Sequence, residues 1–138
     1  MQNCIFCKIV KGELPAFVVF EDDCVLAFLD INPLAQGHTL VIPKKHYENI
    51  FDIDEETLQR IIVVAQKIAQ KMKEVLSAEG VNVINASGKT AEQSVPHFHL
   101  HLIPRKKGDK IDMNAWWQTK TKKITEERLK ELALKLKI

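Results

Sequence analysis

Between Pro96 and Pro104, histidines recur at every second position, as His97, His99 and His101. In a β-strand, successive side chains point to opposite faces, so this spacing places three imidazoles on one face and the intervening apolar side chains on the other. A helix would instead separate His99 from the other two, and the run between the prolines is too short for a stable helix. The stretch therefore predicts a β-strand with one reactive face and one core face.

Three aligned imidazoles favour a functional surface over an ordinary core. Neutral imidazole is a nucleophile, a general base and a metal ligand near pH 7. The preceding loop, residues 85–95, is rich in hydroxyls, side-chain amides and free main-chain amides near Gly88, which suit an oxygen of a phosphate or carboxylate. Taken alone, the loop is more typical of a solvated turn. Beside three histidines, we interpret it as an anion site.

The overall composition excludes several classes of partner. The chain has 138 residues, 46% of them hydrophobic, which suits one domain with a real core. The net charge of +2 comes from 20 basic and 18 acidic residues in an interspersed pattern. We therefore expect no nucleic-acid or membrane partner. The absence of a signal-like segment and the odd count of three cysteines predict a cytoplasmic protein without disulfides.

Apolar periodicity predicts the remaining elements. Residues 17–20 and 24–29 are expected to form a hairpin, and residues 38–42, 81–85 and the histidine stretch further strands. A 3.6-residue period over residues 54–79 predicts a long helix, opened by Asp54 and closed by Gly80. Residues 86–93 are expected to be a loop, and residues 105–110 a polar, mobile segment.

A final helix is expected to start near Thr125. Its apolar positions, which should be buried, are Leu129, Leu132, Ala133 and Leu136. Consecutive strands with one long helix imply an α+β domain whose antiparallel sheet is covered mainly on one face. We expect residues 1–138 to form a single domain, with a core of about residues 1–106 and a C-terminal tail and helix over about residues 107–138.

Cys4 and Cys7 form a C-x-x-C pair that is typical of a redox site, a metal knuckle or simply buried cysteine. A redox pair usually follows a strand, whereas this one begins almost at residue 1, so redox is the weakest interpretation. A tetrahedral zinc site needs two more ligands. His46 and His97 are the candidates that leave His99 and His101 free for catalysis.

Asp30 and His38 are further candidates for the site. Asp30 ends an apolar strand, where a carboxylate could accept hydrogen bonds from the hydroxyls of a sugar or merely cap the strand. His38 opens its own strand and could join the row of histidines from a neighbouring strand. A lone histidine there is also typical of a surface residue.

These residues carry a resemblance to the histidine triad (HIT) family. The segment His97–Ile103, with three histidines alternating with hydrophobic residues, resembles the signature of that family. Segments 4–9, 28–31, 37–46 and 93–95 are similar, in the same order, to segments of its Hint branch. The resemblance covers about the first four-fifths of the chain, and the tail from Asp112 onward lies outside it.

The resemblance implies a nucleotidyl hydrolase or transferase that acts on the α-phosphate of a purine nucleotide, with nucleoside phosphoramidates as the first choice of substrate. His99 would attack phosphorus and form a covalent nucleotidyl-histidine, which water then hydrolyses to a nucleotide product such as AMP. His101, Gln93 and Ser94 would hold the phosphate oxygens and assist the leaving group. Supporting roles would fall to Asn85 at the phosphate, His38 in the imidazole cluster, Asp30 on the ribose, and Ile5, Phe6, Ile9, Phe28 and Ile31 around the base.

The resemblance also implies a fold, an assembly and a metal. The expected fold is a five-stranded antiparallel sheet with the long helix on one face, and the expected assembly is a homodimer with a sheet continuous across two subunits. Related zinc-containing proteins use positions that match Cys4, Cys7, His46 and His97. A closed shell of four protein ligands leaves no position for a substrate water, so this zinc would be structural.

Two positions, Pro96 and Glu92, depart from the family pattern. Pro96 replaces the usual aromatic residue before the first histidine, which removes a main-chain donor from the start of the strand. Glu92 stands where close relatives often have glycine beside the phosphate, so its carboxylate must turn away from the anion. Trp116 and Trp117, in the tail, are expected either to anchor the last helix, which we favour, or to cover the leaving-group side.

Other functions remain open from the sequence. The chain could be a dinucleoside polyphosphate hydrolase of the Fhit-like branch, which would differ in leaving group and share the nucleophile. It could also be a module that binds nucleotides or partners without turnover. A catalytic metal on the three strand histidines is a third chemistry, and it predicts loss of activity on chelation.

Overall fold

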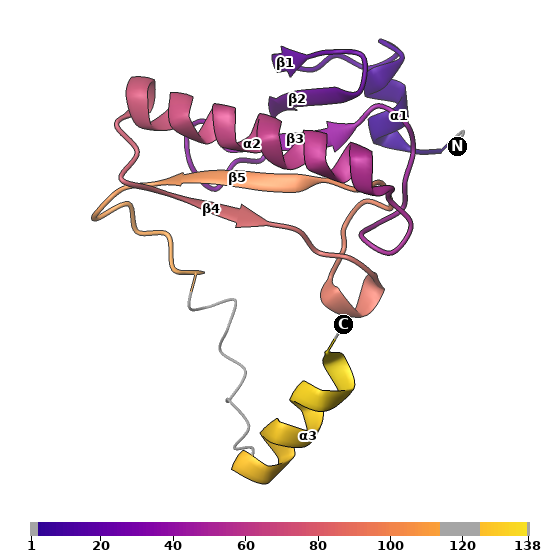
Figure 1. The fold of residues 1–138 in the computed structure, drawn as a ribbon. Coiled ribbons are helices and arrows are strands. Elements are labelled where there is room, and N and C mark those ends of the chain that lie inside the picture. Colours follow the sequence, from indigo (N-terminus) through magenta and orange to yellow (C-terminus); the bar gives the residue numbers. More distant parts are fainter. Residues whose placement is uncertain (1–2, 114–124, 138) are drawn as a thin grey trace.

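The computed structural model describes residues 3–113 and 125–137, and within them it contains one five-stranded sheet and helices on both of its faces (Figure 1). The strand order is β1-β2-β3-β5-β4, and every neighbouring pair is antiparallel. This confirms the predicted α+β fold. The elements are α1 (Ile5–Val10), β1 (Val18–Glu21), β2 (Val25–Leu29), β3 (Thr39–Pro43), α2 (Glu55–Leu76), β4 (Gly80–Ile84), the 3₁₀ helix η1 (Lys89–Ala91), β5 (Leu100–Arg105) and α3 (Glu126–Leu136).

The alternation of side chains along the strands divides the core into two layers. On one face of the sheet, α2 packs over a cluster that includes Phe98, Leu100 and Leu102, as the histidine stretch predicts. On the other face, α1 contributes Cys4, Phe6 and Cys7 to a second cluster, whose sheet residues are Leu26, Phe28, Leu40 and Ile42. Full burial of a Phe or Leu side chain stabilises a fold by roughly 1.5–3 kcal/mol. The apolar side chains of the histidine stretch therefore stabilise the α2 layer, while on the other face Phe6 packs against the rings of His97 and His99.

The strand that carries the histidines is shorter than predicted. β5 begins at Leu100, and only His101 of the three histidines lies within it, opposite Leu40 of β3. Upstream, the main-chain amide of Phe98 donates to the carbonyl oxygen of Tyr47 instead of to β3, so His97 and His99 lie in the connection before β5. The prediction of a strand from His97 is wrong in extent, although the alternation of faces is retained.

The long helix α2 begins as predicted but ends earlier. The Asp54 side chain caps its N-terminus by accepting from the amide of Thr57. The helix ends at Leu76, because Ser77 adopts a left-handed conformation (φ 55°) and donates its amide to the carbonyl of Met72. The predicted stop at Gly80 is therefore wrong, and Gly80 opens β4 instead.

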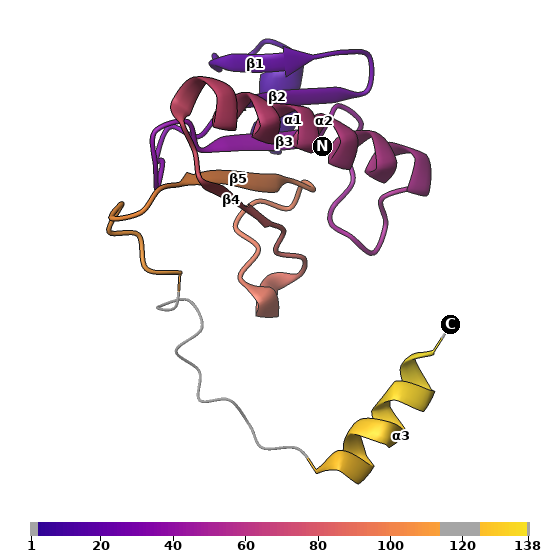
Figure 2. The same cartoon turned by 60° about the vertical axis from the view of Figure 1, so that its left-hand side comes forward.

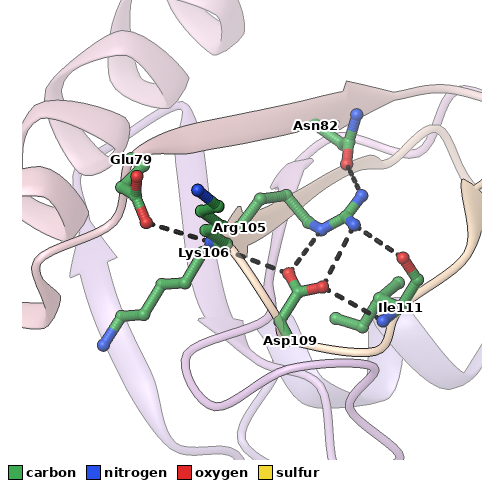
Figure 3. Close-up of polar contacts among 7 residues, drawn as sticks. Glu79, Asn82, Arg105, Lys106, Asp109 and Ile111 are labelled. Carbon is green, nitrogen blue, oxygen red and sulfur yellow. Dashed lines mark hydrogen bonds and ion pairs between the residues drawn. The ribbon is translucent and has the colours of Figure 1, made fainter.

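The polar segment after β5, which is predicted to be mobile, makes several hydrogen bonds to itself and to β4. Arg105 Nε donates to Asp109 at 2.7 Å, and the same guanidinium donates to Asn82 and to the carbonyl of Ile111 (Figure 3). The hydrogen bonds from Arg105 come first among the causes that hold the pKa of Asp109 well below its usual range. The amide of Lys107 also donates to the carboxylate of Glu79, next to β4.

The C-terminal helix α3 forms where it is predicted, with Thr125 as its N-cap, and both views show it apart from the sheet and α2 (Figures 1 and 2). Ala133 is exposed and Leu132 only partly buried, so the predicted burial of Ala133 is wrong. The side chains of Leu129 and Leu136, and the residues Trp116 and Trp117, lie outside the described part of the chain. No helix of the described residues is both long and apolar enough to cross a membrane.

Candidate active site

Three of the predicted site histidines, His38, His99 and His101, gather on the face of the sheet that is opposite α2. The ring centroids of His99 and His101 are 5.0 Å apart, and those of His38 and His101 are 5.2 Å apart. His97 turns away from this group toward the N-terminal cysteines. β3 supplies the neighbouring position to β5, which is why His38, directly before β3, reaches His101.

Cys4, Cys7, His46 and His97 form a compact group, which we call the cysteine–histidine cluster. Their four candidate ligand atoms all lie within 4.8 Å of one another. The Nδ1 atoms of His46 and His97 are 3.2 Å apart, and each lies 3.3 Å from a cysteine Sγ, His46 from that of Cys7 and His97 from that of Cys4. Metal–ligand bonds of about 2.0–2.3 Å in a tetrahedron give edges of roughly 3.3–3.8 Å. The donor set and its spacing therefore fit a tetrahedral metal ion.

The ring of His97 is oriented by a main-chain carbonyl. Nε2 of His97 lies 2.8 Å from the carbonyl oxygen of Pro43, which can only accept, so Nε2 carries the proton and Nδ1 presents a lone pair to the cysteines. His97 is fully buried, and desolvation lowers its pKa to about 4. Burial also raises the pKa of Cys7. A divalent cation would bind the lone pairs of the nitrogen and sulfur atoms and so remove the repulsion between them in this buried group.

His99 is held in one tautomer by its own chain. Its Nδ1 lies 2.8 Å from the carbonyl oxygen of His97, so Nδ1 is the donor and Nε2 retains a lone pair. The ring is 2% exposed and packs edge-on against Phe6, with centroids 5.3 Å apart. Burial lowers its pKa, which keeps the lone pair available near neutral pH. The carbonyl of His99 itself accepts from Asn85, whose other amide atom accepts from Ser87.

Asp30, His38 and His101 form a second group, which we call the Asp30 cluster, with candidate ligand atoms that also lie within 4.8 Å. His38 Nε2 is 2.9 Å from His101 Nδ1 and 3.7 Å from Asp30 Oδ2. The main-chain amide of Leu34 donates to His38 Nδ1 at 3.1 Å. Desolvation is the first cause of the lowered pKa of both histidines, and the pKa of His101 falls to about 4.

A metal bound by the three strand histidines is not supported by this geometry. The lone pair of His97 faces the cysteines, while Nδ1 of His99 donates to a carbonyl. Among the described residues, neither group spaced for a metal ion includes His99.

The loop before the histidines is built differently from the predicted anion site. The amide of Gln93 is engaged with the main chain, since its Oε1 accepts from Gly88 and its Nε2 donates to the carbonyls of Glu48 and Val95. Gln93 therefore shapes the loop, while Ser94 is exposed. Glu92 is exposed in the left-handed region (φ 65°), a conformation that favours glycine. Glycine would adopt this conformation without the strain that a side chain brings.

The apolar residues predicted to surround a base divide into two sets. Phe6 and Phe28 are buried in the second core layer, with Ile9 packed against it. Ile5 and Ile31 are 48% and 77% exposed, so they are available to a ligand. An apolar hollow of 530 Å³ lies on the opposite face, between α2 and the first strands, and no histidine lines it. This hollow is therefore separate from the histidine site.

Sequence reasoning missed the partners that orient the rings. The carbonyl of Pro43 and the amide of Leu34 are main-chain groups. Every residue has a main-chain carbonyl, and every residue except proline has a main-chain N–H. No side-chain pattern could have identified them. Pro43 reaches His97 from the end of β3, 54 residues away in the chain, whereas Leu34 reaches His38 through a local turn four residues long.

Comparisons with known proteins agree with this geometry. The HIT domain model matches residues 11–108. An uncharacterized HIT-like protein of Borreliella burgdorferi is 43% identical over 146 residues, which cover 99% of this chain and 97% of the relative. A zinc-bound histidine triad family protein from Mycobacterium smegmatis has 44% identity, a TM-score of 0.78 and 81% coverage of both chains. A HIT family hydrolase from Legionella pneumophila has 45% identity and a TM-score of 0.69, with 76% of this chain and 95% of the other covered. On this evidence, the chain belongs to the HIT family.

Proposed function

We propose that the protein hydrolyses purine nucleoside phosphoramidates at the α-phosphate through a covalent nucleotidyl-histidine on His99. The observation that carries the proposal is the hydrogen bond from His99 Nδ1 to the carbonyl of His97, which leaves Nε2 as an unprotonated nucleophile. Such an intermediate divides one difficult displacement at phosphorus into two easier steps. The similarity to a HIT family hydrolase supports the reaction class.

In the first step, His99 Nε2 attacks phosphorus and forms an N–P bond while the substrate P–N bond breaks. The leaving amine keeps the bonding pair and takes one proton from solvent. The adduct is an imidazolium with phosphorus on Nε2 and hydrogen on Nδ1, and the carbonyl of His97 stabilises that hydrogen. Water then attacks phosphorus, returns the electron pair to Nε2 and releases one proton and the nucleotide.

The substrate-binding roles follow from the predicted residues. His101 and the exposed hydroxyl of Ser94 are proposed to contact the phosphate oxygens, while Asn85 and Gln93 hold the main chain around them. Asp30, which is hydrogen-bonded to the amide of Asn32 through Oδ1, is proposed to accept from the ribose with Oδ2. The base would lie against the apolar residues Ile5, Phe6, Ile9, Phe28 and Ile31.

Zinc is the metal that we propose for the cysteine–histidine cluster. Two thiolates and two imidazoles in a tetrahedral arrangement are typical of structural zinc, and a related structure is zinc-bound. Such a zinc supplies no reactive water. Its role would be to tie α1 and the segment around His46 to the His97 end of the histidine stretch.

A homodimer is the assembly that we propose. β4 lies at an edge of the sheet, and its Val83 is 50% exposed beside Ile62 and Val63 of α2, which are 50% and 47% exposed. Val83 and the exposed face of α2 line an apolar hollow of 340 Å³. An unpaired edge strand with an apolar flank is a template for pairing with a second copy. Val83→Lys should convert the dimer to monomer in light scattering, and an unchanged mass would contradict this interface.

The decisive experiment is hydrolysis of adenosine 5′-phosphoramidate by the wild-type protein and by His99→Ala. We expect turnover by the wild type only, together with an adenylyl adduct on His99 in the mass spectrum of a quenched reaction. His101→Ala is the matched control, because it removes a neighbouring imidazole and keeps the nucleophile. It should still form the adduct, although more slowly.

Absence of both turnover and adduct in a folded wild-type protein would contradict the proposal. The same assay with a diadenosine polyphosphate then tests the alternative substrate. That reaction has a different leaving group but also requires an adduct on His99, so turnover with an adduct would identify the polyphosphate as the substrate. Retained activity in His99→Ala would exclude the covalent mechanism for either substrate.

A further inference from the structure

The hydrogen bond from the main chain to His38 fixes the direction of a chain of hydrogen bonds. The amide of Leu34 can only donate, so Nδ1 of His38 must be the unprotonated nitrogen. Neutral His38 then carries its proton on Nε2, which lies 2.9 Å from Nδ1 of His101. Nδ1 of His101 is therefore an acceptor, and neutral His101 carries its own proton on Nε2.

We infer that the amide of Leu34 locks His101 as a neutral hydrogen-bond donor, which binds a phosphoryl oxygen through Nε2 and does not transfer a proton to the leaving group. The inference deepens the proposed function and rests on it for the identity of the bound oxygen. Leu34 and His38 act as positioning residues, since they act only through His101.

A proton transfer from His101 conflicts with this arrangement. Loss of Nε2–H from neutral His101 would leave an imidazolate, unless Nδ1 took a proton from His38 at the same time. His38 would then be an imidazolate in its place, because the partner of its Nδ1 among residues 3–113 and 125–137 is the Leu34 amide, which cannot give up its proton to the ring. Imidazolium on His101 is equally disfavoured, because its Nδ1–H would point at the Nε2–H of His38.

Burial acts in the same direction as the hydrogen bonds. His38 is 3% exposed, and desolvation lowers the pKa of His101 to about 4, so both rings are neutral at pH 7. Asp30 is the carboxylate that faces this pair, and the neighbouring imidazole of His99 lies on the other side of His101. A neutral histidine that donates to a substrate oxygen is an established electrophilic role for imidazole.

The first test reads the tautomers directly and requires no turnover. In ¹⁵N spectra of the histidine rings at pH 7, we expect Nδ1 to be unprotonated and Nε2 protonated in both His38 and His101. A proton on Nδ1 of His38, or a doubly protonated His101, would overturn the inference. Leu34→Pro removes the amide hydrogen and should shift His38 toward the other tautomer, whereas Leu34→Ala keeps that hydrogen and should match the wild type.

The second test separates hydrogen bonding from proton transfer. His101→Ala should reduce turnover of adenosine 5′-phosphoramidate and of the adenosine 5′-(p-nitrophenyl phosphate) ester by a similar factor, roughly 100-fold, because both substrates have the phosphoryl oxygen. His101→Gln places an amide donor near the same position and should recover most of the activity on both. A loss confined to the phosphoramidate, without recovery by Gln, would show that His101 is an acid.

Failure of the proposed function is distinguishable from failure of this inference. If the wild type turns over neither substrate, the tautomers can still be measured by NMR. The affinity of each variant for AMP is then measured in place of the turnover rate. AMP should then bind more weakly to His101→Ala than to His101→Gln. Equal affinity of the two variants for AMP would contradict the proposed contact between His101 and a phosphoryl oxygen.

Discussion

The cysteine–histidine cluster and the Asp30 cluster are similarly compact and each contains two histidines, yet these histidines are prepared for different chemistry. In both clusters, the candidate ligand atoms lie within 4.8 Å of one another. They differ in the group behind the ring. His97 has a carbonyl acceptor behind Nε2, so its lone pair points into the cluster, whereas His38 has an amide donor behind Nδ1, so its proton points into the cluster.

This difference decides what each cluster can bind. A metal ion needs an inward lone pair, and a ligating histidine usually donates its other N–H to an acceptor. His97 meets that requirement. A metal ion on Nε2 of His38 would have to displace the only proton of the neutral ring, because Nδ1 already accepts from Leu34. The main chain behind the rings therefore separates a metal site from a hydrogen-bond chain.

The largest expected effect is the loss of His97. His97→Ala should reduce tightly bound metal from one ion per chain to none. The cavity that it leaves should lower the free energy of unfolding by about 3 kcal/mol, as for other fully buried large-to-small changes, and the stabilisation by the metal is lost in addition. His38→Ala is the matched control and should keep the metal. Metal analysis and urea denaturation measure both quantities. Loss of the metal in His38→Ala would remove the distinction between the clusters.

Chelation should have the next largest effect, and it should act on one cluster only. A metal ion at about 1,000 times its dissociation constant stabilises the folded state by about 4 kcal/mol. For a domain of this size, its removal should lower Tm by roughly 15 °C. The tautomers of His38 and His101 should remain unchanged in ¹⁵N spectra of the chelated protein. A change there without unfolding would show that the two clusters are coupled.

Acid should act on the Asp30 cluster through His101. The pKa of His101 is about 4 in the folded state, lowered by desolvation from 6.5, so between these values the unfolded chain binds more protons. The contribution of His101 to stability is therefore present above pH 6.5 and is lost as the pH falls toward 4. His101→Gln cannot titrate, so its stability should decline less than that of the wild type over this window. Parallel urea titrations of the two proteins would measure this, and equal slopes would contradict it.

Removal of the carboxylate in the Asp30 cluster should have the smallest effect on the rings. The negative charge of Asp30 raises the pKa of His38 and of His101 against the larger effect of burial. Asp30→Asn should therefore lower both pKa values further and leave the bound metal unchanged. Its main effect on turnover should be a higher KM, because Asp30 is proposed to bind the ribose. NMR titration gives the pKa values, and a rise in either would show that Asp30 is not the charge that these rings sense.

The sequence contains the pattern that divides the sheet into faces but not the limits of the strands. Alternation predicts that Phe98 and Leu100 lie in the core, and both do. The start of β5 at Leu100 depends on Tyr47, whose carbonyl takes the amide of Phe98. A partner 51 positions away in the chain leaves no local signal.

The candidate site divides in a similar way. Cys4, Cys7, His46 and His97 could be predicted as a group, because metal ligands are side chains of recognisable type. The predicted anion role of Gln93 could not be judged from the sequence, since its amide is committed to the carbonyls of Glu48 and Val95. Residue type predicts which chemistry is available, whereas the fold decides which atoms remain free to perform it.

The cysteine–histidine cluster also has a consequence for the order of events during synthesis. Cys4 and His97 are 93 residues apart, so the two cysteines leave the ribosome well before the last ligand. At about 5–20 residues per second, this interval lasts roughly 5 to 20 s. Until His46 follows, the nascent chain offers a pair of thiols with half of the ligand set, a soft site that also attracts copper(I). The four-ligand shell exists only after β5 has joined β3, so discrimination among metals is a property of the finished domain and not of the emerging chain.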